Sequence, residues 1–178
     1  MTLEEAIIVK ISHDLAGGIG AFMNTVDLIK IDTSFTQEGL DLLSSSGQMI
    51  TSRLKFFRAL FGAENKTINA ELVKEYIATL ASPIEIKGTV KNRLQLAMVA
   101  VGIEILPLGG VIEVQSNGVV LSGKELHHNP VFIQSLMGTH VPCSPENVTA
   151  LWLAHLAEEK GKQIQLDTQE SKLVLTIA

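Results

Sequence analysis

The sequence is poor in cysteine: Cys143 is the only one among 178 residues. A single cysteine excludes a disulfide within the chain. The sequence also shows no positively charged segment followed by an apolar run and a small-residue cleavage site, the pattern of a secretory leader. These absences favour a reducing compartment, so we expect a cytoplasmic protein.

Basic charge and long apolar runs are scarce as well. Lys and Arg number 14 against 19 Asp and Glu, which gives a net charge of −5. A nucleic-acid partner normally requires a strong basic patch, so none is expected. The longest apolar run, residues 94–108, is interrupted by Gln95 and Glu104 and is too short to cross a bilayer, so no membrane is expected either. The 46% of hydrophobic residues suffices for a sizeable core.

One local basic cluster lies within the sequence, formed by Arg53, Lys55 and Arg58. On a helix such a cluster is usually a solvated face. The alternative that stays open is a weak docking site for a partner protein.

The first 30 residues predict one long helix. Thr2 and Glu5 fit the capping box, in which a threonine hydroxyl and a glutamate three residues later bind each other's backbone N–H groups. At about 100° per residue, one apolar stripe runs through Ile7, Ile11, Leu15, Gly18, Phe22, Val26 and Ile29. The stripe ends near Lys30, and a turn with a helix cap is expected from the polar residues that follow, Asp32, Thr33, Ser34 and Thr36.

A second helix is predicted by a seven-residue apolar repeat of Leu40, Leu43, Gly47, Ile50, Leu54, Phe57 and Phe61. Because only a short polar loop joins the two long helices, they must lie antiparallel. A lone hairpin cannot bury such wide apolar faces. Two hairpins are therefore expected to pair in a homodimeric four-helix bundle.

The helical repeat stops at residues 62–67, where we expect a boundary between a helical hairpin, residues 1–63, and a second domain, residues 67–178. Further helices are predicted from Asn69 to about Leu80, from Asn92 to Leu106, from Pro130, and from Ser144 to about Lys160.

Strands are predicted in "SPIEIKG" and in "KQIQLDTQESKLVLTIA", which contains two. A β-hairpin is predicted in "GGVIEVQSNGVVLSG", with Asn117 and Gly118 in a type I′ turn. Helices and mostly antiparallel strands in this order predict an α+β fold, with a sheet covered on one face by helices.

The stretch "KISHDLAGGIGAFMN", residues 10–24, places a histidine and an aspartate beside three glycines. A nucleotide-binding glycine loop is one interpretation. However, Met23 occupies the third glycine position of the dinucleotide fingerprint, and the preceding segment is predicted to be helix rather than strand. A helix that carries a chemically active histidine is therefore the favoured interpretation.

On this helix, His13 lies about 200° from Ile11, on the side away from the apolar stripe, and Gly17 and Gly20 lie within about 40° of it. Each glycine lowers helix stability by about 1 kcal/mol relative to alanine. Close approach of a second helix explains Gly18. Gly17 and Gly20 instead leave bare backbone beside the imidazole, where another protein could approach.

Asp14 follows His13 directly and could accept a hydrogen bond from one ring nitrogen, which would fix which nitrogen is the nucleophile. The alternative is an exposed histidine without chemical function. The neighbouring aspartate and the otherwise unexplained glycines favour the active histidine.

Three segments in this order resemble a known family. "HDLAGGIGAFMNTVDLI" resembles the phosphoacceptor helix of bacterial histidine phosphotransferases of the ChpT type and, more distantly, the H box of sensor histidine kinases. "LQLAMVAVGIEILPLGGVIEV" is similar to the kinase segment that contains the N box, and "SPENVTALWLAHLAEEKGKQIQLD" to the helix and strand after the glycine-rich lid. The resemblance covers nearly the whole chain. It implies a dimeric phosphoacceptor hairpin followed by an α/β-sandwich domain that resembles a histidine-kinase ATP-binding domain.

The chain departs from the kinases where they bind ATP. Ala97 and Val101 replace the asparagines of the N box, and only Glu104 is retained. No Asp-x-Gly-x-Gly follows Val114, and "CSPEN" replaces the lid. Phosphates need an N–H nest, a metal ligand or a cation, so the second domain is expected not to bind ATP. Gly17 replaces the kinase residue that positions a hydrolytic water, which argues against phosphatase activity by that route.

The resemblance implies a phosphorelay. His13 would accept a phosphoryl group from an aspartyl phosphate on the receiver domain of a hybrid histidine kinase and pass it to the receiver domain of a response regulator. Asp14 would orient the ring. The Mg²⁺ would belong to the receiver, so no cofactor and no metal are expected in this chain. A non-enzymatic dimeric scaffold that sequesters response regulators stays open as an alternative.

Docking of the receiver is expected on both helices of the hairpin. Gly17 and Gly20 would give clearance beside the histidine. Lys55 and Arg58 would contact the partner, because antiparallel folding brings this part of the second helix near the level of His13.

Other reactive residues favour simpler interpretations. Cys143 with His140 could indicate a thiol hydrolase, but a lone cysteine is usually a small buried hydrophobe. His127 and His128 have no further ligands at useful spacing, so a surface loop is expected there rather than a metal site. Trp152 and His155 share a mostly apolar helix and are expected to pack in a core or an interface.

Overall fold

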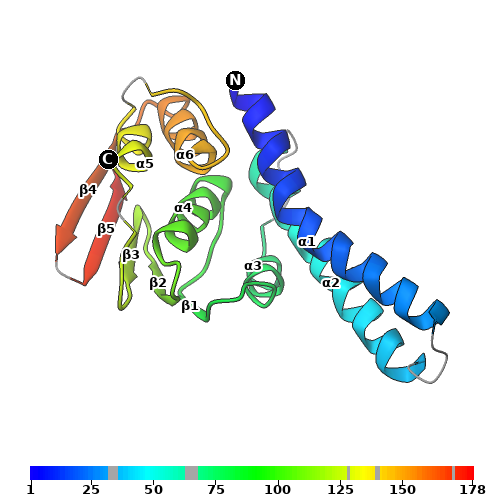
Figure 1. The fold of residues 1–178 in the computed structure, drawn as a ribbon. Coiled ribbons are helices and arrows are strands. Elements are labelled where there is room, and N and C mark those ends of the chain that lie inside the picture. The colour runs from blue at the N-terminus through cyan, green and yellow to red at the C-terminus, as the bar shows by residue number, and fades with distance from the viewer. Residues whose placement is uncertain (32–35, 63–67, 128, 139–140, 170) are drawn as a thin grey trace.

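A computed structural model of the chain describes residues 1–31, 36–62, 68–127, 129–138, 141–169 and 171–178. A pair of long helices is followed by a sheet with shorter helices (Figure 1). The elements in chain order are α1 (Leu3–Ile31), α2 (Thr36–Phe61), α3 (Ala70–Ile77), β1 (Ile84–Lys87), α4 (Arg93–Ile105), β2 (Gly110–Val114), β3 (Gly118–Ser122), α5 (Pro130–Leu136), α6 (Val148–Glu158), β4 (Ile164–Gln169) and β5 (Lys172–Ile177).

The capping box predicted at the start of α1 is confirmed. The backbone N–H of Thr2 donates to Glu5 Oε2 at 2.8 Å, and the backbone N–H of Glu5 donates to Thr2 Oγ1 at 3.2 Å. All seven residues of the predicted stripe are buried or half-buried, so the stripe is the inner face of the helix. The turn and cap predicted from Asp32, Thr33, Ser34 and Thr36 lie outside the described side chains.

Helix α2 forms as the repeat predicts, but its large apolar residues are buried only in its last two turns. Phe56, Phe57 and Leu60 are buried, whereas Leu40 is 52% and Leu54 51% exposed. The hairpin therefore joins the rest of the molecule at one end, and its other end projects away from the sheet (Figure 1).

The five strands form one mixed sheet in the order β1-β2-β3-β5-β4. The β1–β2 pair is parallel, and the β2–β3, β3–β5 and β4–β5 pairs are antiparallel. Alternate residues of β5, among them Leu173 and Leu175, are fully buried on the face that α4, α5 and α6 cover (Figure 1). The predicted α+β fold is confirmed.

Asparagines begin several of the shorter helices, as predicted for Asn69 and Asn92. Their side chains accept hydrogen bonds from the backbone N–H groups of Leu72 and Gln95, respectively. Helix α3 ends at Ile77, before the expected Leu80. Such caps matter because the first N–H groups of a helix have no partner within the helix.

The type I′ turn predicted at Asn117 and Gly118 is wrong. That turn requires positive φ at both central residues, and no non-glycine residue of the described chain has a positive φ. The hairpin closes instead through Gln115, whose backbone N–H donates to the Gly118 carbonyl at 2.9 Å. Gly118 is needed for packing, because a Cβ there would clash with the carbonyl of Leu175 on the neighbouring strand β5.

The hydrophobic core is continuous from α2 to the sheet. The Tyr76 ring of α3 stacks on Phe56 of α2 with centroids 3.8 Å apart. Trp152 of α6 donates from Nε1 to the Leu60 carbonyl at 2.8 Å, which confirms the expected packing role of this tryptophan. The predicted boundary between residues 63 and 67 lies outside the described residues and stays a prediction.

Helix α1 is long and apolar enough, by length and composition alone, to cross a membrane. In the structure its inner face packs against α2, and several outer residues are apolar and exposed, including Ile8, Ile19 and Met23. Helix α1 is thus apolar on two faces. Helix α2 covers the inner face, and the outer face is exposed in the single chain.

Candidate functional site

His13 lies on the outer face of α1, and its side chain is 86% exposed. This position follows from the helical period, since the inner face of α1 is turned toward α2. Its Nδ1 atom lies 3.4 Å from Oδ1 of Asp14. The imidazole is thus open to a large partner and touches one carboxylate oxygen.

Gly17 and Gly20 lie one and two turns beyond the histidine. A Cβ atom built on either glycine would have no neighbouring atom within 4 Å. Neither glycine is therefore required by packing within the chain. A surface without side chains adjoins the imidazole, as the sequence predicted.

The register of the hairpin places Lys55 at the level of His13. Gly18 packs against Ile50, and the Arg53 guanidinium donates to the Asp14 carbonyl. In each of these two contacts between the antiparallel helices, the residue numbers add up to about 68. By the same rule, His13 of α1 lies at the level of Lys55 of α2. Lys55 forms a 3.0 Å ion pair with Glu75 of α3 and therefore lies on the α3 side of α2. Arg58 is exposed in the last turn of α2.

Lys10 is a site residue that the sequence reasoning missed. Its Nζ atom lies 3.2 Å from Asp14 Oδ2 and 3.2 Å from Glu104 Oε1 of α4. Thr149 of α6 donates to the same Glu104 oxygen at 2.8 Å. The i,i+4 spacing of Lys10 and Asp14 was a usable signal for the first contact, but Glu104 is distant in sequence.

The expectation that Arg53 belongs to a solvated face is wrong. Its side chain is half-buried and donates from Nη1 to the carbonyl of Asp14. It also donates from Nε to Thr79 Oγ1 at 3.2 Å and from Nη2 to the Thr79 carbonyl at 2.9 Å. A guanidinium presents several donors in a fixed plane, so Arg53 ties α1 and the turn after α3 to α2.

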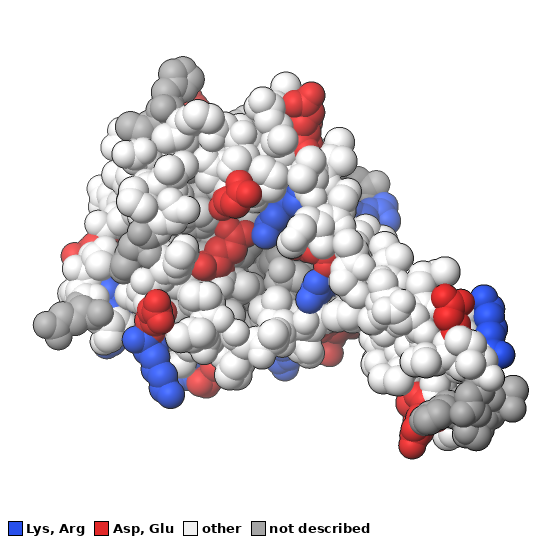
Figure 2. All heavy atoms as spheres, in the orientation of Figure 1, with Lys and Arg blue, Asp and Glu red and all other residues white. Residues whose placement is uncertain are grey.

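These polar groups line a cavity of about 210 Å³ between the hairpin and α4. Figure 2 shows acidic and basic side chains gathered around a hollow where the hairpin meets the rest of the molecule. Burial disfavours the charge of Lys10, but the carboxylates of Glu104 and Asp14 outweigh it and raise the pKa of Lys10 to about 12. Burial, and then the charge of Asp14, raises the pKa of Tyr76 to about 12.

Burial also raises the pKa of Glu104, although the charge of Lys10 and the hydrogen bond from Thr149 oppose that shift. The Glu104 side chain is 24% exposed and the Lys10 side chain 21%. Both ends of this ion pair are thus largely removed from water.

Residues 86–172 match the family model described as "Histidine phosphotransferase C-terminal domain". The chain carries a histidine phosphotransferase C-terminal domain. The resemblance stated from the sequence is thereby confirmed, and the chain has a phosphorelay role and a transferase kind of activity. No curated protein sequence matches the chain.

The structure of a bacterial phosphotransferase is similar to this chain over 99% of this chain and 95% of its own length, with a TM-score of 0.80 and 23% identity. At that identity the likeness establishes a shared fold. The Acinetobacter baumannii histidine kinase AdeS covers 93% of this chain and 95% of its own, at a TM-score of only 0.37 and 12% identity.

Helix α4 carries the residues that align with the kinase N box. Ala97 and Val101, which replace the asparagines of the kinase N box, are fully buried in the core. Glu104 is engaged by Lys10 and Thr149. Among the residues that the structure describes, no group of three or more His, Cys, Asp or Glu could hold a metal ion.

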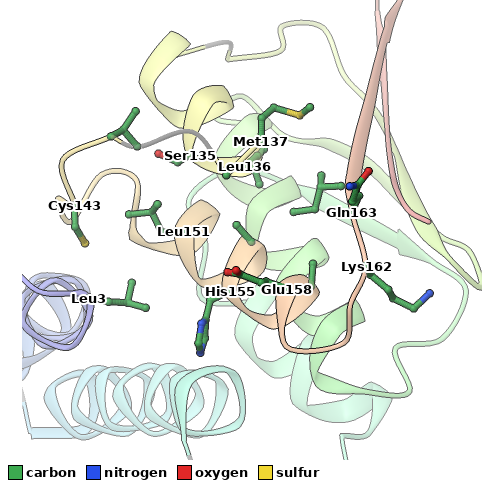
Figure 3. A pocket seen from close by; sticks show the side chains of 15 residues that line it. Leu3, Ser135, Leu136, Met137, Cys143, Leu151, His155, Glu158, Lys162 and Gln163 are labelled. Atoms are coloured by element: carbon green, nitrogen blue, oxygen red, sulfur yellow. The ribbon is translucent and has the colours of Figure 1, made fainter.

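A separate cavity of about 770 Å³ lies between the start of α1, helix α6 and the segment after α5 (Figure 3). Leu3, Cys143, His155 and Glu158 line it from different elements. Burial raises the pKa of the Cys143 thiol, which opposes formation of a nucleophilic thiolate. His140 and His128, named above as alternative reactive residues, lie outside the described part of the chain.

Proposed function

We propose that the chain is a phosphorelay histidine phosphotransferase that carries a phosphoryl group between receiver-domain aspartates through a phosphohistidine at His13. The observation that carries this proposal is the exposed His13 ring, with Nδ1 beside Asp14 and bare helix backbone at Gly17 and Gly20. The histidine phosphotransferase domain that follows supports it.

The contact with Asp14 suits nucleophilic catalysis. With the proton on Nδ1, the ring donates to Asp14 Oδ1 and leaves the lone pair of Nε2 directed away from the carboxylate. In the transfer, a bond forms between Nε2 and phosphorus while the bond from phosphorus to the receiver's carboxylate oxygen breaks. The carboxylate of Asp14 then stabilises the positive charge that develops on the ring. Transfer to the second receiver reverses these changes.

The receiver would supply the Mg²⁺ and the cation that stabilise the transferring phosphoryl group. We propose that the donor is the receiver domain of a hybrid histidine kinase, that the acceptor is a response regulator, and that both meet the chain in the cytoplasm. Gly17 and Gly20 would admit the receiver close to His13. Lys55 and Arg58, near the same level of the hairpin, would lie at the edge of the docked receiver.

We propose that the transfer needs no ATP on this chain. The buried Ala97 and Val101 and the engaged Glu104 support this view, since they leave α4 without ligands for a nucleotide-bound metal. Titration with a fluorescent ATP analogue and Mg²⁺ should give no saturable signal. Incubation with labelled ATP alone should leave His13 unlabelled, and phosphorylation under those conditions would contradict ATP independence.

We further propose that two chains pair through their hairpins. The exposed apolar residues of α1 and α2, including Ile19, Met23, Leu40 and Leu54, support this view. A contiguous apolar surface on a small protein usually marks an interaction site. A four-helix bundle would cover these residues and leave the two His13 rings on its outer surface.

The direct test is label transfer from a phosphorylated receiver domain to the purified chain. Acid-labile label should appear on the wild type and on a His127→Ala control, and not on a His13→Ala variant. Label retained by His13→Ala would overturn the assignment of His13. If the wild type takes no label but binds the receiver, and His13→Ala binds equally well, the chain is a scaffold instead.

A further inference from the structure

Asp14 divides its two carboxylate oxygens between two partners. Oδ1 lies 3.4 Å from His13 Nδ1, and Oδ2 lies 3.2 Å from Lys10 Nζ. Arg53 binds the backbone carbonyl of Asp14 and so fixes the main chain. The rotamer of the Asp14 side chain, by contrast, depends on what holds Oδ2.

Lys10 is itself held from the second part of the chain. Its Nζ atom lies 3.2 Å from Glu104 Oε1, and Thr149 donates to that same oxygen at 2.8 Å. The contacts therefore run without a break from α6 through α4 to α1, and they end at the histidine ring. A flexible lysine side chain that is gripped at its tip by two carboxylates loses most of its freedom.

Stability alone does not account for the pair of Lys10 and Glu104. Burial raises the pKa of Glu104 even though Lys10 lies beside it, so the folded chain holds the charged carboxylate at a cost in free energy. Apolar residues of similar size often replace a buried ion pair without loss of stability. A role in placing other groups explains why charged residues occupy these positions.

We propose that Lys10 and Glu104 are positioning residues, which hold Asp14 in the orientation that keeps the proton of His13 on Nδ1 and leaves Nε2 as the nucleophile. This inference rests on the proposed function of His13. It makes the histidine phosphotransferase domain a part of the phosphoacceptor site, since Glu104 belongs to that domain.

The test is nitrogen-15 NMR of the His13 ring, measured without any receiver. In the wild type, Nδ1 should give the shift of a protonated ring nitrogen and Nε2 that of an unprotonated one. Lys10→Met and Glu104→Met should move both shifts toward those of an unrestrained histidine, which carries its proton mainly on Nε2. Lys10→Arg should restore the wild-type shifts, and Lys87→Met, which removes an exposed lysine of β1, should not alter them.

Unchanged shifts in both methionine variants would overturn the proposal, and so would a failure of Lys10→Arg to restore them. A loss of folding cannot mimic the result, because each variant is first checked by its unfolding transition. If Lys10→Met does not fold, the ring shifts of Glu104→Met alone test the proposal, because that variant keeps Lys10 and removes only its Glu104 partner.

Phosphotransfer kinetics separate this inference from the proposed function. For Lys10→Met we expect kcat to fall about tenfold, as misplacement of a reacting group does, with KM for the receiver unchanged. An increase in KM alone would show that these residues serve docking and would overturn the positioning role. If the ring shifts respond as expected but wild-type His13 accepts no phosphoryl group, the proposed function fails while the orientation of the ring by this network stands.

Discussion

Gly18 of α1 lies so close to Ile50 of α2 that a Cβ atom on the glycine would be 2.9 Å from Ile50 Cγ1. Real Cβ atoms do not come this close to their neighbours, so the two helices can approach to this distance only at glycine. Gly17, the preceding residue, has no such neighbour within 4 Å. Adjacent glycines of one helix thus serve different purposes.

This difference predicts opposite effects of the same substitution. Gly17→Ala should raise the free energy of unfolding by up to about 1 kcal/mol, because alanine favours the helix and meets no atom. Gly18→Ala should instead lower it by about 1 kcal/mol, because overpacking outweighs the gain in propensity. Urea denaturation of both variants measures the difference. Equal stabilisation by the two substitutions would show that the helices separate freely at Gly18.

Larger side chains at the open glycines should block docking. Gly17→Leu and Gly20→Leu are expected to fold normally, since the space beside each is open. We expect each to raise KM for phosphotransfer from a receiver at least about tenfold, the effect of losing about 1.4 kcal/mol of binding. A small phosphodonor such as phosphoramidate should still label His13 in both variants. If receiver and small donor react equally well, clearance is not the function of these glycines.

The sequence was sufficient to predict the parts of the fold that depend on neighbouring residues. The stripe from Ile7 to Ile29, the capping box at Thr2 and the cap at Asn92 all concern residues within a few turns of each other. The helical period also placed His13 on the outer face. Nothing in the spacing of Lys10 and Glu104 indicates their contact, because it depends on how α4 packs against the hairpin.

The two main errors have similar causes. The spacing of Arg53, Lys55 and Arg58 predicts a solvated face, but the turn after α3 brings Thr79 to Arg53 as its acceptor. The Asn117-Gly118 pair predicts a turn, but the carbonyl of Leu175 on the neighbouring strand β5 is what requires glycine at position 118. In both cases a residue distant in sequence decides the local role.

Glu104 should make stability depend on pH. Its pKa is raised on folding from the ordinary value of 4.5, so its contribution to stability is complete below that value and is lost as pH rises through the folded pKa. Relative to Glu104→Gln, which does not titrate, the wild type should lose unfolding free energy from about pH 4.5 upward. Denaturation of both proteins across this range measures the difference, in which the carboxylates that do not interact with Glu104 cancel.

A second variant tests the cause of that shift. Lys10 lowers the pKa of Glu104, whereas burial raises it and Asp14 adds to the rise. The comparison is therefore repeated with Lys10→Met in both proteins, one with Glu104 and one with Glu104→Gln. The difference between their free energies of unfolding should become larger and should extend to higher pH. A difference that shrinks, or that is independent of pH in the wild-type background, would show that Glu104 is solvated in the folded chain.

Self-association should depend on the uncovered apolar face of the hairpin. Leu40 is 52% exposed on α2, toward the end that projects away from the sheet. Replacing it with glutamate should have little effect on a lone chain, since exposed substitutions usually change stability by less than about 0.5 kcal/mol. In a dimer, the same change places two charges in an apolar bundle, which should shift the population to monomer.

Light scattering during size-exclusion chromatography measures this equilibrium. The wild type and a Leu108→Glu control, altered at a leucine that is 60% exposed outside the hairpin, should elute as dimers, and Leu40→Glu as a monomer. The unfolding midpoint of the wild type should also rise with protein concentration, because pairing stabilises only the folded chain. A wild type that stays monomeric at all concentrations would remove the four-helix bundle from the proposal, and His13 would then have to act on a single hairpin.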